Sequence, residues 1–247
     1  KGKHYIYEGC STSCCLVEMD EEPPHPPNQN ALHIALEIAK HLNMKIVDEL
    51  QFMRKTVIDG SNVSGFQRTG MVGYDGVIET SKGDVGIMGL FLEEEAAKKI
   101  EQKDSHVKYR LDRLGIPLVE IATSPDIIDA EHAKEVAEKI GMILRSTDVM
   151  RGIGSIRQDV NISIRGGART EIKGFQDFKS IPKVIDIEID RQLSLIAKKE
   201  KIEQTVRKAE PDFTTTFLRP MPGAARMYPE TDVIPVKLSD IKVERSE

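Results

Sequence analysis

The stretch S-I-R-Q-D-V-N-I-S-I-R-G-G-A-R-T-E-I-K, residues 155–173, decides the expected fold because it reads as two strands joined by a glycine turn. Side chains in a strand have a period of two, and the first half alternates apolar with polar residues. A two-residue turn would put apolar and charged residues on the same face. A three-residue loop at 166–168 instead sets Ser163 against Glu171 and joins the polar faces. We therefore predict an antiparallel hairpin with this loop.

The shared polar face of this hairpin carries charges of both signs. The residues expected on it are Asp159, Asn161, Ser163, Glu171 and Lys173, with Arg157 and Arg169 on the same strands. Carboxylates bind magnesium and cations neutralise phosphate oxygens, so the mixture suits a magnesium and phosphate site. A polar sheet face that only meets water is an equally good interpretation of the hairpin taken alone.

Amphipathic helices and further strands flank the hairpin. Apolar residues at helical spacing predict helices over residues 28–42, 126–144 and 180–196. Strands are predicted over 84–92, 106–112 and 116–123, with an extended pair at 3–19 and a polar loop at 60–76. This order predicts an α+β fold with one antiparallel sheet and helices packed on one face.

Composition excludes several classes of protein. The chain has 247 residues, of which 39% are hydrophobic and 30% charged, and no apolar run approaches the ~18 residues of a membrane span. Its net charge of −5 provides no general basic field for nucleic acid. Cys10, Cys14 and Cys15 suit small buried thiols in a reducing cytoplasm better than disulfides or a zinc site.

Other charged residues lie in contexts that suit a site. Three glutamates, residues 93–95, end a predicted strand, and Glu120 is the single charge in an apolar one. A buried, unpaired carboxylate is costly, so Glu120 needs a metal ion or an arginine, unless its strand is an edge strand in water. The irregular segment 218–232 carries Arg226 and Tyr228, which suit either a substrate site or plain surface. Neither a P-loop nor a Rossmann glycine motif is present.

Four segments of the chain resemble the B/E subunit family of tRNA-dependent amidotransferases. They are Y-R-L-D-R-L-G-I-P-L-V-E-I-A-T-S-P-D-I (109–127), M-R-G-I-G-S-I-R-Q-D-V-N-I-S-I (150–164), T-E-I-K-G-F-Q (170–176) and R-M-Y-P-E-T-D (226–232). The D-E-E-P-P-H segment at 20–25 and the loop at 218–232 favour the archaeal E form over the bacterial B form. The resemblance runs in order from Tyr5 to about Pro235.

The resemblance implies a glutamine synthetase-like α+β cradle domain at residues 1–235, with 236–247 as the start of an insert domain or linker. It implies a kinase and transamidase that uses ATP and Mg²⁺ to phosphorylate the glutamate side chain of misacylated Glu-tRNA(Gln). Ammonia from a partner amidase, the asparaginase-like D-type subunit of a heterodimer or heterotetramer, then gives Gln-tRNA(Gln). The expected location is the cytoplasm, without membrane attachment.

The resemblance also implies residue roles. The implied metal ligands are Glu93, Glu94, Glu120, Asp159 and Glu171. The implied catalytic residues are Glu171, Lys173, Arg157 and Arg113. The implied nucleotide-binding residues are Arg157, Lys173, Arg226 and Tyr228.

One part of the family pattern is missing from this sequence. The G-L-E-x-H segment that opens the family and helps to hold metal is absent, and the domains with most of the tRNA contact would lie beyond Glu247. We therefore expect a fragment that folds but does not catalyse alone. A metal-dependent phosphohydrolase or nuclease with the same carboxylates, and a non-catalytic RNA-binding scaffold, are the alternatives.

Overall fold

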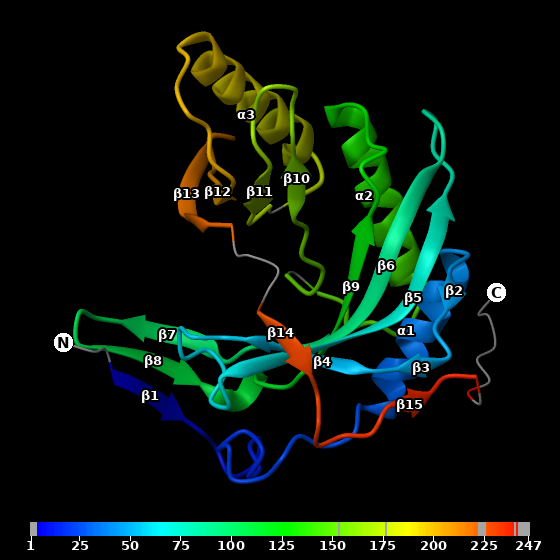
Figure 1. Cartoon of the computed structure of the whole chain (residues 1–247), viewed down its shortest axis with the longest axis vertical. Helices are drawn as coiled ribbons and strands as arrows, with labels where there is room; N and C mark the ends of the chain where they lie inside the picture. The colour runs from blue at the N-terminus through cyan, green and yellow to red at the C-terminus, as the bar shows by residue number, and fades with distance from the viewer. Residues whose placement is uncertain (1–3, 153, 176, 222–225, 240, 242–247) are drawn as a thin grey trace. The chain divides into compact units, whose positions relative to one another are not determined.

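The computed structural model of the chain describes residues 4–152, 154–175, 177–221, 226–239 and 241 (Figure 1). The chain divides into two compact units, one with Lys1–Val77, Gly86–Ser124 and Ala224–Glu247, the other with Ile78–Val85 and Pro125–Gly223. Three α-helices and four sheets occur among the described residues. The α+β class is therefore confirmed, whereas the expected single sheet is wrong, because separate groups of strands bury separate apolar clusters.

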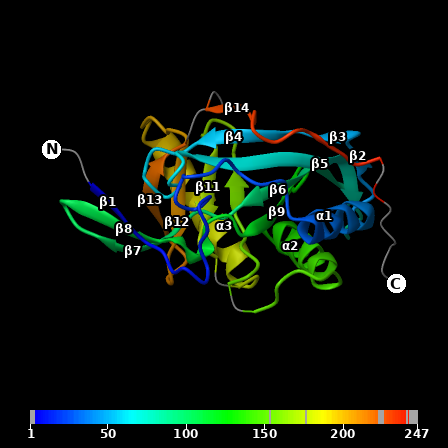
Figure 2. The same ribbon diagram turned by 90° about the horizontal axis from the view of Figure 1, so that it is seen from below.

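The largest sheet of the first unit has six strands. In spatial order they are β14 (Met227–Pro229), β4 (Phe52–Thr56), β5 (Phe66–Ile78), β6 (Val85–Glu94) and β9 (Pro117–Thr123), with β2 (Lys45–Ile46) paired to β5. Helix α1 (Gln29–His41) lies along one face of this sheet (Figure 2). The helix begins where Asn28 accepts a hydrogen bond from the Ala31 amide at 3.0 Å, as the sequence predicted. Its apolar stripe, including Leu32, Ala35 and Ile38, is buried.

The polar loop expected at residues 60–76 is wrong, because most of it belongs to the 13-residue strand β5. The glycines within β5 are explained by close packing rather than by turns. A Cβ on Gly76 would lie 2.7 Å from the carbonyl oxygen of Leu42, and one on Gly70 would lie 2.6 Å from Leu50. Glycine therefore lets neighbouring segments approach the strand closely.

Two smaller sheets complete the first unit. One contains β1 (His4–Glu8), β8 (His106–Arg110) and β7 (Lys98–Gln102), followed by a 3-10 turn at Leu111–Arg113, and the other pairs β15 (Val236–Lys237) with β3 (Glu49–Leu50). Strand β1 pairs in parallel with β8. The extended pair predicted within residues 3–19 is therefore wrong, since β1 finds its partner about 100 residues away.

The cysteines are free thiols, as the sequence predicted. Their expected burial is wrong, because Cys10 and Cys15 are exposed and Cys14 is half-buried. They lie in a turn segment after β1, where the Cys14 amide donates to the Cys10 carbonyl at 2.9 Å. Cys14 packs against the apolar cluster that includes Val107 and Tyr109, whereas Cys10 and Cys15 face solvent.

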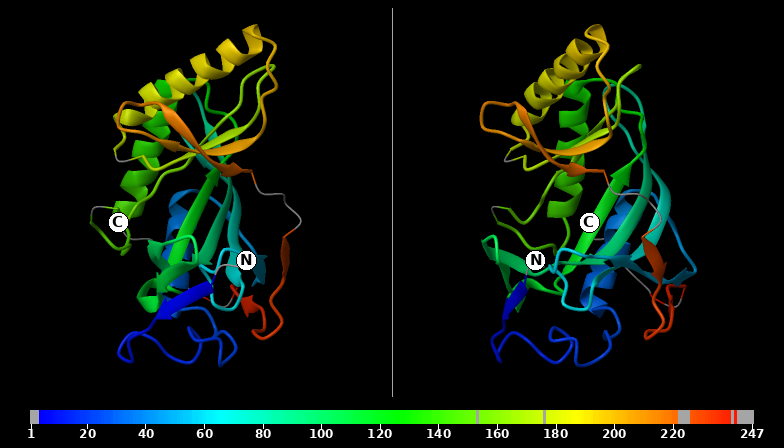
Figure 3. Two further views of the ribbon diagram at one scale, coloured as in Figure 1. Left: turned by 90° about the vertical axis from the view of Figure 1, so that its left-hand side faces the viewer. Right: turned by 60° about the vertical axis from the view of Figure 1, so that its left-hand side comes forward.

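The second unit places two helices with one four-stranded sheet. The strands, in spatial order, are β10 (Val160–Ile162), β11 (Thr170–Lys173), β12 (Thr205–Ala209) and β13 (Thr215–Pro220), and the helices are α2 (Ala130–Arg145) and α3 (Ser180–Ala197). Helix α3 runs across one face of the sheet (Figure 3). Ile162 and Ile172 from the sheet pack with Ile181 and Val184 from α3 to form the core. Asp129 caps α2, accepting a hydrogen bond from the His132 amide at 2.8 Å.

The buried stripe of α3 differs from the one predicted. The apolar residues Ile181, Ile185, Ile189, Leu193 and Ile196 recur at a spacing of about four in the sequence, which predicts that they form the buried stripe, but Leu193 is 50% exposed. Each step of four advances about 40° beyond a full turn, so three steps from Ile181 rotate the stripe by about 120°. Glu188 and Gln192 are fully buried instead.

The hairpin forms with a register different from the one predicted. Val160 lies opposite Ile172 and Asn161 opposite Glu171, so the strands are shifted by two residues. An even shift keeps each side chain on its face, which is why the shared polar face of Asn161 and Glu171 is confirmed. The prediction of a three-residue loop at 166–168 is wrong. The Gly167 amide donates to the Ile164 carbonyl, and Gly166 has a φ of +81°. Residues 163–169 thus form a longer connection.

In the part of the chain that the structure describes, none of the helices has both the length and the apolar character required to cross a membrane.

Candidate functional site

Lys173 contacts two carboxylates on the polar face of the hairpin in the second unit. Its Nζ lies 2.6 Å from Oε1 of Glu171 and also forms an ion pair with Asp159. The pKa of Lys173 is raised. Burial alone would lower it, but the hydrogen bonds that Lys173 donates to Asp159 and Glu171 have the larger combined effect. The group therefore remains an ammonium at neutral pH, balanced by two negative charges.

This arrangement follows from the register of the two strands. Glu171 and Lys173 alternate onto one face of β11, and Asp159 immediately precedes β10. Arg157 lies two residues further back and is exposed. The structure thus brings three of the predicted site residues into direct contact and places the fourth on the same segment.

Helix α3 holds the connection between these strands. Gln192 donates to the Ala168 carbonyl and accepts from the Ala168 amide, each at 3.1 Å, and it also donates to Oγ1 of Thr170 at 3.1 Å. A Cβ on Gly167 would lie 2.2 Å from Oε1 of Gln192, so any other residue would force the Gln192 amide to shift. These contacts fix the chain directly before Glu171.

Glu188 anchors the same side of α3. It is fully buried and accepts two hydrogen bonds from Arg191, at 2.8 and 2.6 Å, and one from Thr215 at 2.9 Å. Burial raises the pKa of Glu188, but these hydrogen bonds outweigh it and its pKa is lowered. Sequence reasoning missed Glu188 and Gln192. The sequence signal that could have revealed them is their spacing, because Val184, Glu188 and Gln192 follow one another at intervals of four residues and share one face of the helix.

In the first unit, Glu93 and Glu94 point to opposite faces of the large sheet. Glu93 is buried and pairs with Lys55 at 3.1 Å, whereas Glu94 accepts a hydrogen bond from Arg68 Nε at 3.1 Å and pairs with its Nη2. Consecutive side chains of a strand alternate between faces, which explains the separation. The structure therefore does not bring these two predicted metal ligands together.

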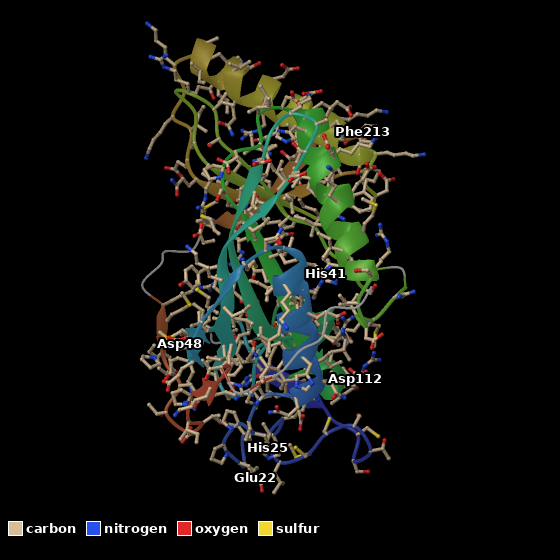
Figure 4. All side chains as sticks on the ribbon, turned by 90° about the vertical axis from the view of Figure 1, so that its right-hand side faces the viewer. Glu22, His25, His41, Asp48, Asp112 and Phe213 are labelled. Atoms are coloured by element: carbon tan, nitrogen blue, oxygen red, sulfur yellow. The ribbon has the colours of Figure 1, made fainter. Side chains whose placement is uncertain are left out.

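Arg68 ties Glu94 to the segment before α1. The Arg68 side chain is only 5% exposed and also donates to the His25 carbonyl at 2.8 Å. Figure 4 shows the side chains of His25 and Glu22 close together on that segment, where His25 Nε2 lies 3.6 Å from Glu22 Oε2. Glu94 therefore serves packing between the sheet and this segment.

Glu120 is exposed on β9, which is an edge strand of the large sheet. It lies opposite Phe91, and the register places it on the same sheet face as Glu93. The burial cost expected for its carboxylate does not arise, because the edge of a sheet is open to water. Its role as a metal ligand stays a prediction.

The remaining predicted residues of the first unit occupy separate positions. Arg113 donates to Oε2 of Glu95 at 3.2 Å. The Arg226 carbonyl accepts a hydrogen bond from the Thr56 amide at 2.9 Å, and Tyr228 lies on β14 and is 44% exposed. Their roles in catalysis or nucleotide binding stay predictions.

Two acids beside Tyr228 have a structural role. Arg54 donates to Glu230 from Nε at 3.0 Å and from Nη2 at 2.5 Å, and to Asp232 at 2.5 Å. Burial raises the pKa of Glu230, but the Arg54 hydrogen bonds outweigh this and its pKa is lowered. The prediction of an irregular loop over 218–232 is therefore wrong in part, because its start belongs to β13 and residues 227–229 form β14, which pairs with β4.

Asp159 and Glu171 fit a divalent cation. Both offer carboxylate oxygens, the ligands that Mg²⁺ prefers, and one ammonium already contacts both of them. Among the described residues, no group of three or more His, Cys, Asp or Glu side chains is placed to hold a metal ion. Glu93, Glu94 and Glu120 belong to the first unit and the other two acids to the second, so their gathering at one metal stays a prediction.

The sequence matches the family model of the GatB/GatE catalytic domain over residues 7–244. The E-type subunits of glutamyl-tRNA(Gln) amidotransferase from three archaea are similar to this chain. Identity is 57% for the protein of Methanocaldococcus jannaschii, 56% for that of Methanothermobacter thermautotrophicus and 57% for that of Pyrococcus abyssi. The alignments cover 85%, 81% and 84% of this chain but 33%, 32% and 32% of those proteins.

The chain thus spans about a third of the length of the curated relatives that it matches. The family model, in contrast, covers nearly the whole sequence. The chain therefore belongs to the GatB/GatE catalytic domain family.

Proposed function

We propose that this chain carries the kinase and transamidase centre of a glutamyl-tRNA(Gln) amidotransferase, on a glutamine synthetase-like α+β scaffold. The proposed reaction phosphorylates the glutamate side chain of Glu-tRNA(Gln) with ATP and then replaces the phosphate with ammonia. Family membership and the names of the relatives support the reaction class. The observation that carries the assignment of the site is the contact of Lys173 with Asp159 and Glu171.

The residues of the hairpin have complementary roles in this proposal. The glutamate carboxylate and the γ-phosphate of ATP are both anionic, so they approach only where positive charge is concentrated. Lys173 and Arg157 would neutralise phosphate oxygens, and Asp159 and Glu171 would hold Mg²⁺. Magnesium, when bound, would supply further positive charge that orients the phosphate.

Residues of the first unit also have roles in this proposal. Glu93, Glu94 and Glu120 are the proposed further metal ligands, with Glu94 the weakest candidate because Arg68 already engages it. Arg113 is proposed to neutralise charge, and Arg226 and Tyr228 to contact the nucleotide.

The proposal includes a partner. Ammonia would come from an asparaginase-like amidase, the D-type subunit of a heterodimer or heterotetramer, and tRNA(Gln) would be bound mainly by domains outside this chain. A cytoplasmic location follows from the proposed substrate, since aminoacyl-tRNA is used in the cytoplasm.

The test uses the full-length protein with its amidase partner, Glu-tRNA(Gln), ATP, Mg²⁺ and glutamine. We expect Gln-tRNA(Gln) to form only when ATP is present, and Glu171→Gln to remove this activity. The matched control is Glu203→Gln, because Glu203 is an exposed acid of the same unit and forms an ion pair with Lys201. ATP-independent cleavage of RNA, or release of phosphate without any need for Glu-tRNA, would indicate a phosphohydrolase or nuclease instead.

A further inference from the structure

The ammonium of Lys173 occupies the place between two carboxylates that a metal cation would take. Glu171 Oε1 lies 2.6 Å from Nζ, and Asp159 Oδ2 pairs with the same atom. The side chains of Asp159, Lys173 and Glu171 are 43%, 35% and 21% exposed, so solvent reaches the group. An ion can therefore arrive without unfolding of the strands.

A divalent cation and the ammonium compete for the same oxygen atoms. Two carboxylates carry a charge of −2, which the ammonium reduces to −1 and a divalent cation reduces to zero. Holding both cations between the same two groups would place like charges within a few ångströms. The ammonium therefore has to leave the pair when a divalent cation binds.

The lysine has the longest side chain of this cluster. Its charge lies at the end of a flexible four-carbon chain, whereas Glu171 follows a backbone segment that Gln192 holds at Ala168 and Thr170. Asp159 is placed by the adjoining strand β10. Departure of the ammonium thus leaves the two carboxylates in position.

We propose that Lys173 is an internal counter-cation, which a divalent metal ion displaces from Asp159 and Glu171, and whose released ammonium then binds an anionic group of the substrate. The exchange couples metal binding to the appearance of a free positive charge beside the metal. This inference rests on the proposed function, because it assigns the anion to a phosphate of the nucleotide.

The first test measures the affinity of the full-length protein for Mn²⁺, followed by its electron paramagnetic resonance signal and displaced with Mg²⁺. Lys173→Met removes the competing ammonium. We therefore expect the Lys173→Met protein to bind Mn²⁺ at least about threefold more tightly than the unaltered protein. Lys208→Met is the matched control, since Lys208 is the register partner of Lys173 on β12 and pairs with Glu210. Asp159→Asn should weaken binding.

Two results of this measurement would overturn the proposal. One is equal or weaker Mn²⁺ binding by Lys173→Met together with the same behaviour in Lys173→Gln, when both variants keep the unfolding midpoint of the unaltered protein. The other is a failure of Mn²⁺ to bind any of the proteins. If Lys173→Met does not fold, Lys173→Gln and the labelling experiment decide the question.

The second test follows the lysine itself. An amine-reactive acetylating reagent, with mass spectrometry of the peptides, reports how quickly Lys173 is modified with and without Mg²⁺. We expect Mg²⁺ to increase its labelling rate, because the amine leaves its two carboxylates, while labelling of Lys208 stays constant. An unchanged rate at saturating Mg²⁺ would contradict displacement.

Failure of this inference is separable from failure of the proposed function. Formation of Gln-tRNA(Gln) without any effect of Lys173→Met on Mn²⁺ binding would remove only the displacement step. Displacement of Lys173 in a protein that forms no Gln-tRNA(Gln) would leave the cation exchange intact and remove the proposed function.

Discussion

Gln192 of α3 forms hydrogen bonds with both backbone polar groups of Ala168, donating to the carbonyl and accepting from the amide at 3.1 Å each. Ala168 lies outside the paired residues of β10 and β11, so no strand partner satisfies its backbone there. The side-chain amide of Gln192 provides the two hydrogen bonds that a neighbouring strand would otherwise make. Buried backbone groups without partners are costly, so this contact allows the connection between β10 and β11 to lie against the helix. The position of Glu171 depends on it.

Replacing Gln192 should therefore destabilise the second unit. We expect Gln192→Ala to lower the free energy of unfolding by about 2 kcal/mol, because it leaves the amide and the carbonyl of half-buried Ala168 without this partner and removes the bond to buried Thr170. Urea denaturation followed by circular dichroism measures the change. Leu193→Ala, at the next and exposed position of α3, is the control and should cost less than about 1 kcal/mol. Equal losses in both variants would contradict the role of the hydrogen bonds.

Gly167 should tolerate no side chain. Gly167→Ala puts a Cβ 2.2 Å from Oε1 of Gln192, so we expect a loss of about 2 kcal/mol in unfolding free energy. Gly9→Ala is the control, because its Cβ would meet neighbours only at 3.6 Å and beyond. Gln192→Ala removes the shortest contact, although Ile164 Cγ1 at 2.8 Å remains, so the double variant should lose clearly less than the sum of the single variants. Additive losses would show that Gln192 is not the obstacle.

Glu94 should behave as a structural residue. Glu94→Gln leaves the Arg68 guanidinium, which is 5% exposed, without its carboxylate, and we expect a loss of about 2 kcal/mol in unfolding free energy. Glu8→Gln removes a surface pair with Lys108 and should cost less than about 1 kcal/mol. If the Glu94 carboxylate is used by Arg68 alone, Mn²⁺ affinity should stay unchanged in Glu94→Gln. A marked loss of Mn²⁺ binding with normal stability would restore Glu94 as a metal ligand.

Glu120 should show the opposite behaviour. Because its side chain is exposed on an edge strand, Glu120→Gln should leave the unfolding free energy within about 0.5 kcal/mol of the original value. If Glu120 holds Mg²⁺, the same change should abolish ATP-dependent phosphorylation of Glu-tRNA(Gln), since an amide lacks the charge that the ion requires. Glu49→Gln, another exposed strand carboxylate of the first unit, is the control for both measurements. Full activity of Glu120→Gln would refute the assignment.

Acid should weaken the attachment of residues 230–232 to β4. The pKa of Glu230 is lowered below its ordinary value of 4.5. Its pairing with Arg54 therefore contributes its full stability above pH 4.5, and this contribution is lost as the pH falls through the lowered pKa. We expect Glu230→Gln to lack this part of the acid sensitivity, on the order of 1 kcal/mol between pH 5 and the acid limit. Unfolding curves from pH 6 downward measure it, with the surface acid variant Asp75→Asn as control. Parallel stability curves for all three proteins would exclude the contribution.

Some features of this protein follow from short stretches of sequence. The start of α1 was predictable because Asn28 accepts a hydrogen bond from an amide three residues on. For α2 the sequence offered Asp126 or Asp129 as the cap, and the structure uses Asp129. The shared face of Asn161 and Glu171 was predictable because strand parity survives an even shift in register. The family was predictable from motifs of seven to nineteen adjacent residues. Each of these depends on local bonding or on local order.

Tertiary structure alone decided the features that depend on partners far away in the chain. Glu93 and Glu94 are neighbours in sequence, yet Lys55 and Arg68 pair with them on different faces of the sheet. The glycines of β5 read as a loop until the packed neighbours that need the space are known. Gln192 reads as a surface residue until the backbone of the connection between β10 and β11 lies against it. A residue carries its own hydrogen-bonding capacity, but packing determines which groups are close enough to use it, and that follows only from the folded chain.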